Sequence, residues 1–127
     1  MYNIIKFDLK MDAPKISIKF YGGPRIRYHF MLLSPEGNGE ILKEWRGNNW
    51  DKEADEFSTE FKGDDLKFAP LSWQFDIFPN PNIPGEKYRI NLDIKQGEKP
   101  IFLKEYENSG VSKPEIITED AVFVPNV

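Results

Sequence analysis

Apolar and polar residues alternate with a period of two along much of this chain. The alternation is clearest in residues 5–10, 15–20 and 88–95, where apolar side chains occupy one parity and charged or polar side chains the other. Successive side chains of a strand point to opposite faces of its sheet, so each segment has one apolar face and one polar face. The pattern therefore predicts half-buried strands in antiparallel sheets.

Residues 26–33 and 71–78 are richer in large apolar and aromatic side chains, and we expect these two segments at the centres of their sheets. Weaker strand candidates are residues 40–45, 56–61, 101–106 and 121–124. The apolar parity of the clearer segments also predicts the residues of the hydrophobic core. We expect this core to contain mainly Ile5, Phe7, Ile18, Phe20, Tyr28, Phe30, Leu32, Trp73, Phe75, Ile77, Ile90, Leu92 and Ile94.

Clusters of Gly, Pro and Asn separate the strand candidates, most clearly at residues 22–24, 34–39 and 78–85. These residue types favour turns and interrupt strand pairing. We therefore predict a single antiparallel β-sandwich of about seven to nine strands, with residues 1–127 forming one domain. A closed β-barrel is the alternative. No long segment has a period of 3.6, so we expect at most one short helical turn, near residues 50–56.

The chain contains no Cys, which excludes disulfides and thiolate metal ligands. Small secreted domains often depend on disulfides, so this composition favours a reducing compartment. Residues 1–12 lack the basic lead and the apolar run of a signal peptide. No window approaches the roughly 18 apolar residues of a membrane-spanning helix. We expect a soluble, cytoplasmic protein that makes no contact with a membrane.

The formal net charge of −4 argues against nucleic-acid binding, which requires a basic face. The charge is unevenly spread. Residues 1–31 hold six Lys or Arg and two Asp or Glu, whereas residues 34–65 hold four Lys or Arg and ten Asp or Glu. Two solvated sheet faces of different sign would explain this distribution. A charged docking surface that steers a partner is the alternative interpretation.

His29 is the only histidine, and no Gly-x-Ser-x-Gly motif is present. A zinc site or a Ser-His-Asp triad would need further partners for this imidazole, so we expect His29 to be an ordinary strand residue. We expect no catalytic residue and no cofactor, and therefore a protein that is not an enzyme. A hydrolase that uses only carboxylates is a remote alternative, because pairs of acids arise by chance among 21 acidic residues.

Acids recur in residues 51–56 with the spacing that opens a calcium-binding loop. The resemblance to that loop fails further on, because Glu56 stands where the loop needs Gly and Lys62 stands where it needs a closing Glu. We therefore expect no metal site of this kind. A weak calcium site of another kind remains open, and its ligands would be Asp51, Glu53, Asp55, Asp64 and Asp65.

The segment from Trp45 to Trp50 is the best candidate for a binding site. It combines two Trp, one Arg and two Asn in six residues, and Trp and Arg dominate the energetics of protein interfaces. Its Gly and Asn residues predict a loop after Trp45. In the alternative interpretation Trp45 belongs to the core and Trp50 plugs the end of the sandwich. The candidate binding residues are Trp45, Arg46, Asn48, Asn49 and Trp50.

These observations favour a non-catalytic binding module, and foremost a protein-interaction domain such as an inhibitor, an immunity protein or an assembly subunit. Its partner would be another protein, and a second copy of this chain remains open as a partner. The alternative is a carbohydrate-binding module in which Trp45 and Trp50 stack on sugar rings and the neighbouring amides bind the hydroxyls.

Overall fold

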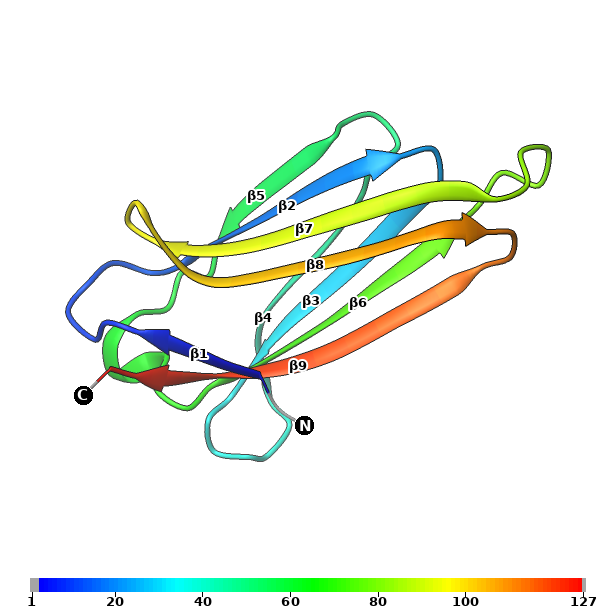
Figure 1. Cartoon of the computed structure of the whole chain (residues 1–127). Coiled ribbons are helices and arrows are strands. Elements are labelled where there is room, and N and C mark those ends of the chain that lie inside the picture. Colours follow the sequence, from blue (N-terminus) through cyan, green and yellow to red (C-terminus); the bar gives the residue numbers. More distant parts are fainter. Residues whose placement is uncertain (1–2, 127) are drawn as a thin grey trace.

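The computed structural model describes residues 3–126, except for the side chain of Ser109, as nine strands and one short helical turn (Figure 1). The helical turn, η1, spans Gly63–Asp65. The strands are β1 (Asn3–Phe7), β2 (Lys15–Gly22), β3 (Arg25–Leu33), β4 (Ile41–Asn48), β5 (Ala54–Ser58), β6 (Pro70–Phe78), β7 (Glu86–Gln96), β8 (Lys99–Val111) and β9 (Glu115–Pro125).

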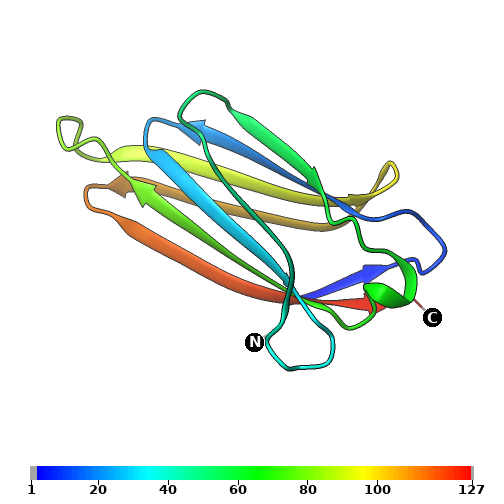
Figure 2. The same ribbon diagram turned by 180° about the vertical axis from the view of Figure 1, so that it is seen from behind.

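The strands form two sheets that pack face to face (Figures 1 and 2). Sheet A has the order β1-β9-β6-β3-β4, and sheet B has the order β5-β2-β7-β8. The predicted β-sandwich is confirmed, and its nine described strands lie within the expected number. Each sheet ends in two edge strands, so the alternative of a closed barrel is wrong.

One strand pair departs from the antiparallel prediction, because β1 pairs with β9 in parallel, with Asn3 opposite Ala121 and Phe7 opposite Pro125. All other strand pairs between described residues are antiparallel. The strand that follows β1 along the chain is β2, which belongs to the other sheet. No hairpin therefore dictates the direction of β1, and a parallel pairing is open to it.

The core fills the space between the sheets, and all thirteen predicted core residues are buried, with 5% exposure or less. Phe30 stacks on Trp73 near the middle of sheet A, with ring centroids 5.9 Å apart. Further buried residues come from the same apolar faces. Two others, Leu66 and Ala69, come from the connection between β5 and β6, where no alternation marks them.

The helical turn lies at residues 63–65 and not near residues 50–56, where the sequence suggested it. Instead, β5 begins at Ala54 and pairs with β2, so that Phe57 lies opposite Ile16. This pairing places the Phe57 ring among the core aromatics, a gain that outweighs the local helix signal of the acids and Asn49. Among residues 3–126, no helix has the length and apolar character needed to cross a membrane.

Three tyrosines join the two sheets through hydrogen bonds to carboxylates. Tyr28 of sheet A donates to Asp55 of sheet B, while Tyr88 and Tyr106 of sheet B donate to two glutamates of β9 in sheet A. Burial, followed by the hydrogen bond to Glu115, raises the pKa of Tyr88 to about 12. Burial and the bonded carboxylate likewise hold the pKa values of Tyr28 and Tyr106 well above the ordinary value for tyrosine. The hydroxyls therefore remain protonated donors across the physiological range.

Candidate functional site

The candidate binding segment does not form a loop after Trp45, because β4 continues to Asn48. The strand pairs with β3 throughout, with Arg46 opposite His29 and Asn48 opposite Arg27. Gly47 provides space here and does not make a turn. It lies opposite Tyr28, and a Cβ built on Gly47 would collide with the Tyr28 ring and hydroxyl.

Strand parity divides the three candidate residues that lie in β4 between two environments. Trp45 lies opposite the buried Phe30 and faces the core, where its ring stacks on Phe57 with centroids 4.8 Å apart. Trp45 is half-buried and packs against the core, as the alternation along β4 indicates. Arg46 and Asn48 lie on the outer face of sheet A, next to the outward-facing positions of β3.

The two asparagines hold the end of β4 in place. Asn49 donates from Nδ2 to the carbonyl of Pro24 at 3.2 Å, and its Oδ1 accepts from the backbone N–H of Ile26 at 2.7 Å. Asn48 accepts the backbone N–H of Trp50 on its Oδ1 at 3.0 Å. Asn49 thus fastens the chain to the start of β3, and Asn48 fixes the turn that presents Trp50.

Trp50 lies on the surface and is 44% exposed, so it does not plug the end of the sandwich. The Arg25 guanidinium lies 5.8 Å from the centroid of the Trp50 ring. Arg25 stands opposite Phe78 in the ladder, and the next outward residue of β3, Arg27, lies 5.4 Å from the Phe78 ring. Phe78 is 36% exposed. Two aromatic rings and two arginines therefore adjoin one another at this end of sheet A.

Ile116 extends this group, since it pairs with Asp76, which in turn pairs with Arg27, and it is 68% exposed. We call Arg25, Arg27, Trp50, Phe78 and Ile116 together the Trp50 surface. Only Trp50 among them was a candidate from the sequence. In the sequence, Arg25 and Arg27 alternate with Ile26 and Tyr28, which are buried. This alternation indicates that both arginines lie on the outer face of sheet A.

A shallow hollow of about 340 Å³ lies beside the Trp50 surface, and Arg27, His29, Arg46, Gln74 and Asp76 are among the residues that line it. Its ionisable groups are paired. Arg27 donates to Asp76 at 3.0 Å, and Gln74 donates to the other oxygen of the same carboxylate at 2.7 Å. His29 Nε2 lies 2.9 Å from an oxygen of Glu44. His29 is thus a surface strand residue held by Glu44 of the neighbouring strand.

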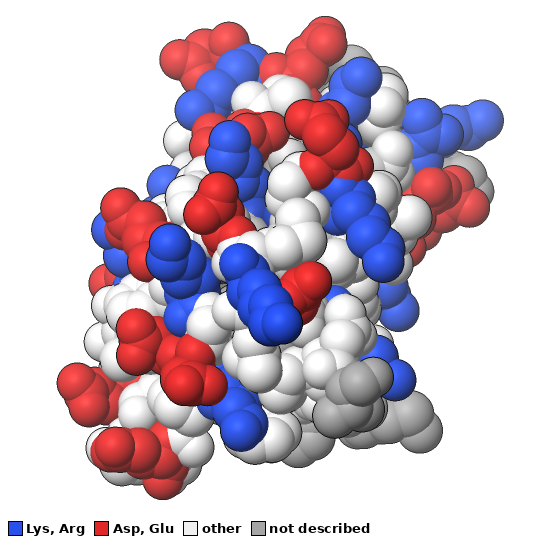
Figure 3. Space-filling model, turned by 90° about the vertical axis from the view of Figure 1, so that its left-hand side faces the viewer, with Lys and Arg blue, Asp and Glu red and all other residues white. Residues whose placement is uncertain are grey.

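The uneven charge along the sequence is compensated within the fold. The basic strand β2 pairs with the acidic strand β5, and Lys15 lies 4.0 Å from Glu56. Lys62 of the acidic segment lies 3.7 Å from Asp12 of the basic segment. Figure 3 shows the end of the sandwich that carries the β1–β2 connection, and there acids and bases are interspersed. This end therefore presents no broad face of one sign.

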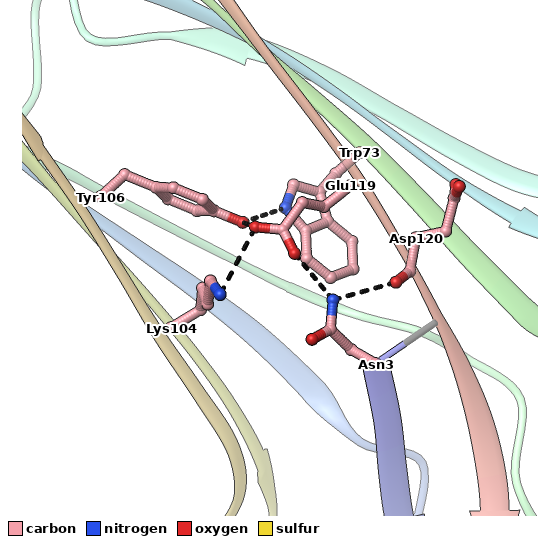
Figure 4. A network of polar contacts seen from close by, with 6 residues as sticks. All are labelled: Asn3, Trp73, Lys104, Tyr106, Glu119 and Asp120. Atoms are coloured by element: carbon pink, nitrogen blue, oxygen red, sulfur yellow. Dashed lines mark hydrogen bonds and ion pairs between the residues drawn. The ribbon is translucent and has the colours of Figure 1, made fainter. Parts of the chain in front are cut away.

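The inward-facing acids at the β8/β9 side are bound by neighbouring side chains. Figure 4 shows Glu119, which accepts from Tyr106 and from Asn3 Nδ2 at 2.7 Å and lies 3.7 Å from Lys104 Nζ. Trp73 Nε1 donates to the Tyr106 hydroxyl at 3.0 Å. This arrangement fastens β1 and β8 to β9 through a single carboxylate.

The five acids of the alternative calcium site, Asp51, Glu53, Asp55, Asp64 and Asp65, do not form a cluster in the structure. Asp55 accepts from Tyr28 and lies 3.2 Å from Lys52, whereas Asp64 and Asp65 belong to η1. Across residues 3–126, no three His, Cys, Asp or Glu side chains are arranged to hold a metal ion.

The fold is a two-sheet β-sandwich of nine described strands, with an aromatic and arginine surface at one end of sheet A. The sequence matches no protein-family model and no curated protein. Two solved structures resemble it.

A domain of unknown function, DUF4425, from Bacteroides vulgatus is 12% identical with a TM-score of 0.58, and the match covers 94% of this chain and 100% of that one. A DUF4425 family protein from Bacteroides ovatus is 15% identical with a TM-score of 0.55, covering 87% of this chain and 96% of that one. Likeness at these identities shows the fold alone.

Proposed function

We propose that this chain is a non-catalytic protein-binding domain that contacts its partner through the Trp50 surface. The observation that carries the proposal is the exposure of Trp50, Phe78 and Ile116 around two arginines on one sheet face. Exposed aromatic and apolar side chains interleaved with arginine are the composition of interface hot spots. An inhibitor, an immunity protein or an assembly subunit would each use such a surface.

The Trp50 surface is held in a defined geometry before any partner arrives. The hydrogen bond from the Trp50 backbone to Asn48 fixes the turn, and the two bonds of Asn49 tie the preceding backbone to β3. Arg25, Arg27 and Phe78 all stand on paired strands of sheet A. Side chains on a rigid support lose less entropy on binding, which favours affinity.

The charges of this surface indicate the chemistry of the partner. Arg25 makes no ion pair with any described residue. Arg27 lies 3.0 Å from the carboxylate of Asp76, and Arg46, which is on the same face and largely exposed, lies 3.8 Å from that of Glu44. A partner with acidic side chains around an apolar pocket would complement both the arginines and the Trp50 ring.

The arrangement of the two tryptophans favours a protein partner over a carbohydrate. Trp45 stacks on Phe57 inside the sandwich, whereas Trp50 lies outside it, so the two rings form no common platform for a sugar chain. Arg25 also lies over the Trp50 ring. What remains is one exposed tryptophan among arginine and apolar side chains, which suits a protein contact better than a row of sugar rings.

The test is affinity capture with the native organism's lysate, followed by binding measurements on each captured protein. Trp50→Ala and Phe78→Ala should each weaken the complex by about 2 kcal/mol. Ile41→Ala is the matched control, because Ile41 is an exposed apolar residue at the other end of β4 and 48% exposed. A partner that binds all three variants like the unaltered protein would contradict the proposal. So would a glycan that shifts the tryptophan emission of the unaltered protein but not that of Trp50→Ala.

A further inference from the structure

A second, larger hollow lies on sheet B. Its lining comes from the last residues of β2 and β8 and the first residues of β7, which lie at the same end of the sheet (Figure 1). Its volume of about 700 Å³ falls in the range of small-molecule sites. The residues of its lining that bear on ligand chemistry are Tyr21, Gly22, Lys87, Arg89, Glu107 and Asn108.

Arg89 and Tyr21 contact each other in the lining of this hollow. They stand opposite each other in the ladder of β2 and β7, and the Arg89 guanidinium lies over the Tyr21 ring at 4.2 Å from its centroid. Lys19 Nζ lies 5.4 Å from the same centroid. A guanidinium that lies over a ring keeps the N–H groups of its own plane free for a bidentate acceptor. Arg89 is therefore oriented before any ligand arrives.

The two cations of the lining, Lys87 and Arg89, make no ion pair with any residue that the structure describes. One acid, Glu107, lines the same hollow and lies opposite Arg89 in the ladder. Two nearby acids are bound elsewhere. Glu86 accepts the backbone N–H of Asn80 at 2.7 Å, and Glu115 accepts from Tyr88 and Asn108.

The backbone around the hollow is irregular at two places. The pairing of β7 with β8 shifts its register between Glu86 and Tyr88, and such irregularities redirect side chains near binding sites. Gly22, the last residue of β2, has a φ of +104°, and a Cβ there would collide with the carbonyl of Lys87. Only glycine therefore fits at position 22, where the backbone of β2 lies against that of Lys87.

We infer that this hollow binds a small oxyanion, a carboxylate or a phosphate, between Arg89 and Lys87. The Asn108 amide is already bonded within the chain, since it donates to Glu115 and accepts the backbone N–H of Gly110. The Glu107 carboxylate, also in the lining, accepts hydrogen bonds from hydroxyl or amino groups, so it selects acids that carry such groups. The hollow lies on sheet B and the Trp50 surface on sheet A, so this site does not depend on the proposed function.

The experiment is an NMR titration of the isotope-labelled protein with inorganic phosphate and, separately, with citrate, at constant ionic strength. We expect saturable shifts of the Arg89 Nε–H and of the backbone amides of Tyr21 and Gly22. Arg89→Gln should weaken binding about tenfold or more, because it removes a charge-assisted bidentate contact. Lys87→Gln should weaken it less. Lys67→Gln, which removes the same charge from the exposed connection between β5 and β6, should bind like the unaltered protein.

The two probes separate the possible sources of the oxyanion. Saturation with phosphate alone identifies a phosphoryl ligand, and saturation with citrate alone identifies a carboxylic acid. Shifts that rise linearly without saturation, for both probes, would overturn the inference, since they indicate general screening of surface charge. An equal loss of binding in Lys67→Gln would overturn it as well. An unchanged amide spectrum of each free variant shows that the fold is retained.

Discussion

Gly47→Ala provides a sharp test of how the candidate segment is built. A Cβ on Gly47 would lie within 2.7 Å of three atoms of Tyr28: the hydroxyl oxygen, Cζ and Cε2. The Tyr28 ring is buried between Phe20, Phe30 and Phe57 and cannot move without disturbing them. The substitution must therefore displace either the ring or strand β4.

The expected cost has two parts. Overpacking a well-filled core costs about 1–3 kcal/mol. A displaced ring also weakens the hydrogen bond from Tyr28 to Asp55, and a bond to a charged group contributes about 1.5–3 kcal/mol. We therefore predict that Gly47→Ala lowers the free energy of unfolding by about 3 kcal/mol, measured by urea unfolding followed through tryptophan fluorescence.

Gly110→Ala is the matched control, because Gly110 also lies in a strand but nothing stands within 4 Å of a Cβ built on it. Its effect should stay within about 1 kcal/mol of zero. Tyr28→Leu removes the atoms that collide, so in the double variant with Gly47→Ala the two costs should fall short of additivity by about 1 kcal/mol or more. Additive costs, or a Gly47→Ala variant as stable as Gly110→Ala, would refute this account.

Three further predictions concern the Trp50 surface and the tyrosines. Trp50→Ala should change the free energy of unfolding by less than about 1 kcal/mol, whereas a buried tryptophan would cost about 3–5 kcal/mol; calorimetry distinguishes the two. Asn49→Ala should cost about 2 kcal/mol, because it leaves the Ile26 N–H without its partner, and a destabilisation below 0.5 kcal/mol in urea unfolding would contradict this. The raised pKa values of Tyr28, Tyr88 and Tyr106 stabilise the fold fully below about pH 10 and cease to do so as pH rises toward 12 and beyond. Absorbance at about 295 nm should show three tyrosines that ionise only well above pH 10 in the folded protein, and complete ionisation near pH 10 would disprove it.

The core was predictable because parity is a strong local signal. Ile18, Phe30 and Trp73 each stand in an alternating segment, and an error of one residue would have placed every apolar side chain in water. Leu66 could not be found in this way. It follows η1 in a long connection, and its burial depends on how that connection folds over the end of the sandwich.

The candidate site was predictable only in part, because strand parity covers only some of its residues. Composition marked Trp45 and Trp50 alike, but Trp45 lies within β4 and faces the core, whereas Trp50 lies in the turn after that strand, where parity assigns no face. Phe78 and Ile116 reach the Trp50 surface through pairings of β6 with β3 and β9, which join segments far apart in the chain. The pattern of residues within one segment does not show which residues of two distant strands will lie opposite each other.

The parallel pairing of β1 with β9 also determines the order in which the molecule can fold. Ile5 and Phe7 have no exposed surface in the finished sandwich, and the only strand that pairs with theirs is the last one described, with Ile5 opposite Phe123. During synthesis the first strand must therefore wait until more than a hundred further residues have been made. Contacts of such long sequence separation form slowly, since a large loop has to close before they stabilise anything. Until β9 arrives, the apolar face of β1 lacks the strand that pairs with it, at the stage when aggregation or capture by a chaperone competes with folding.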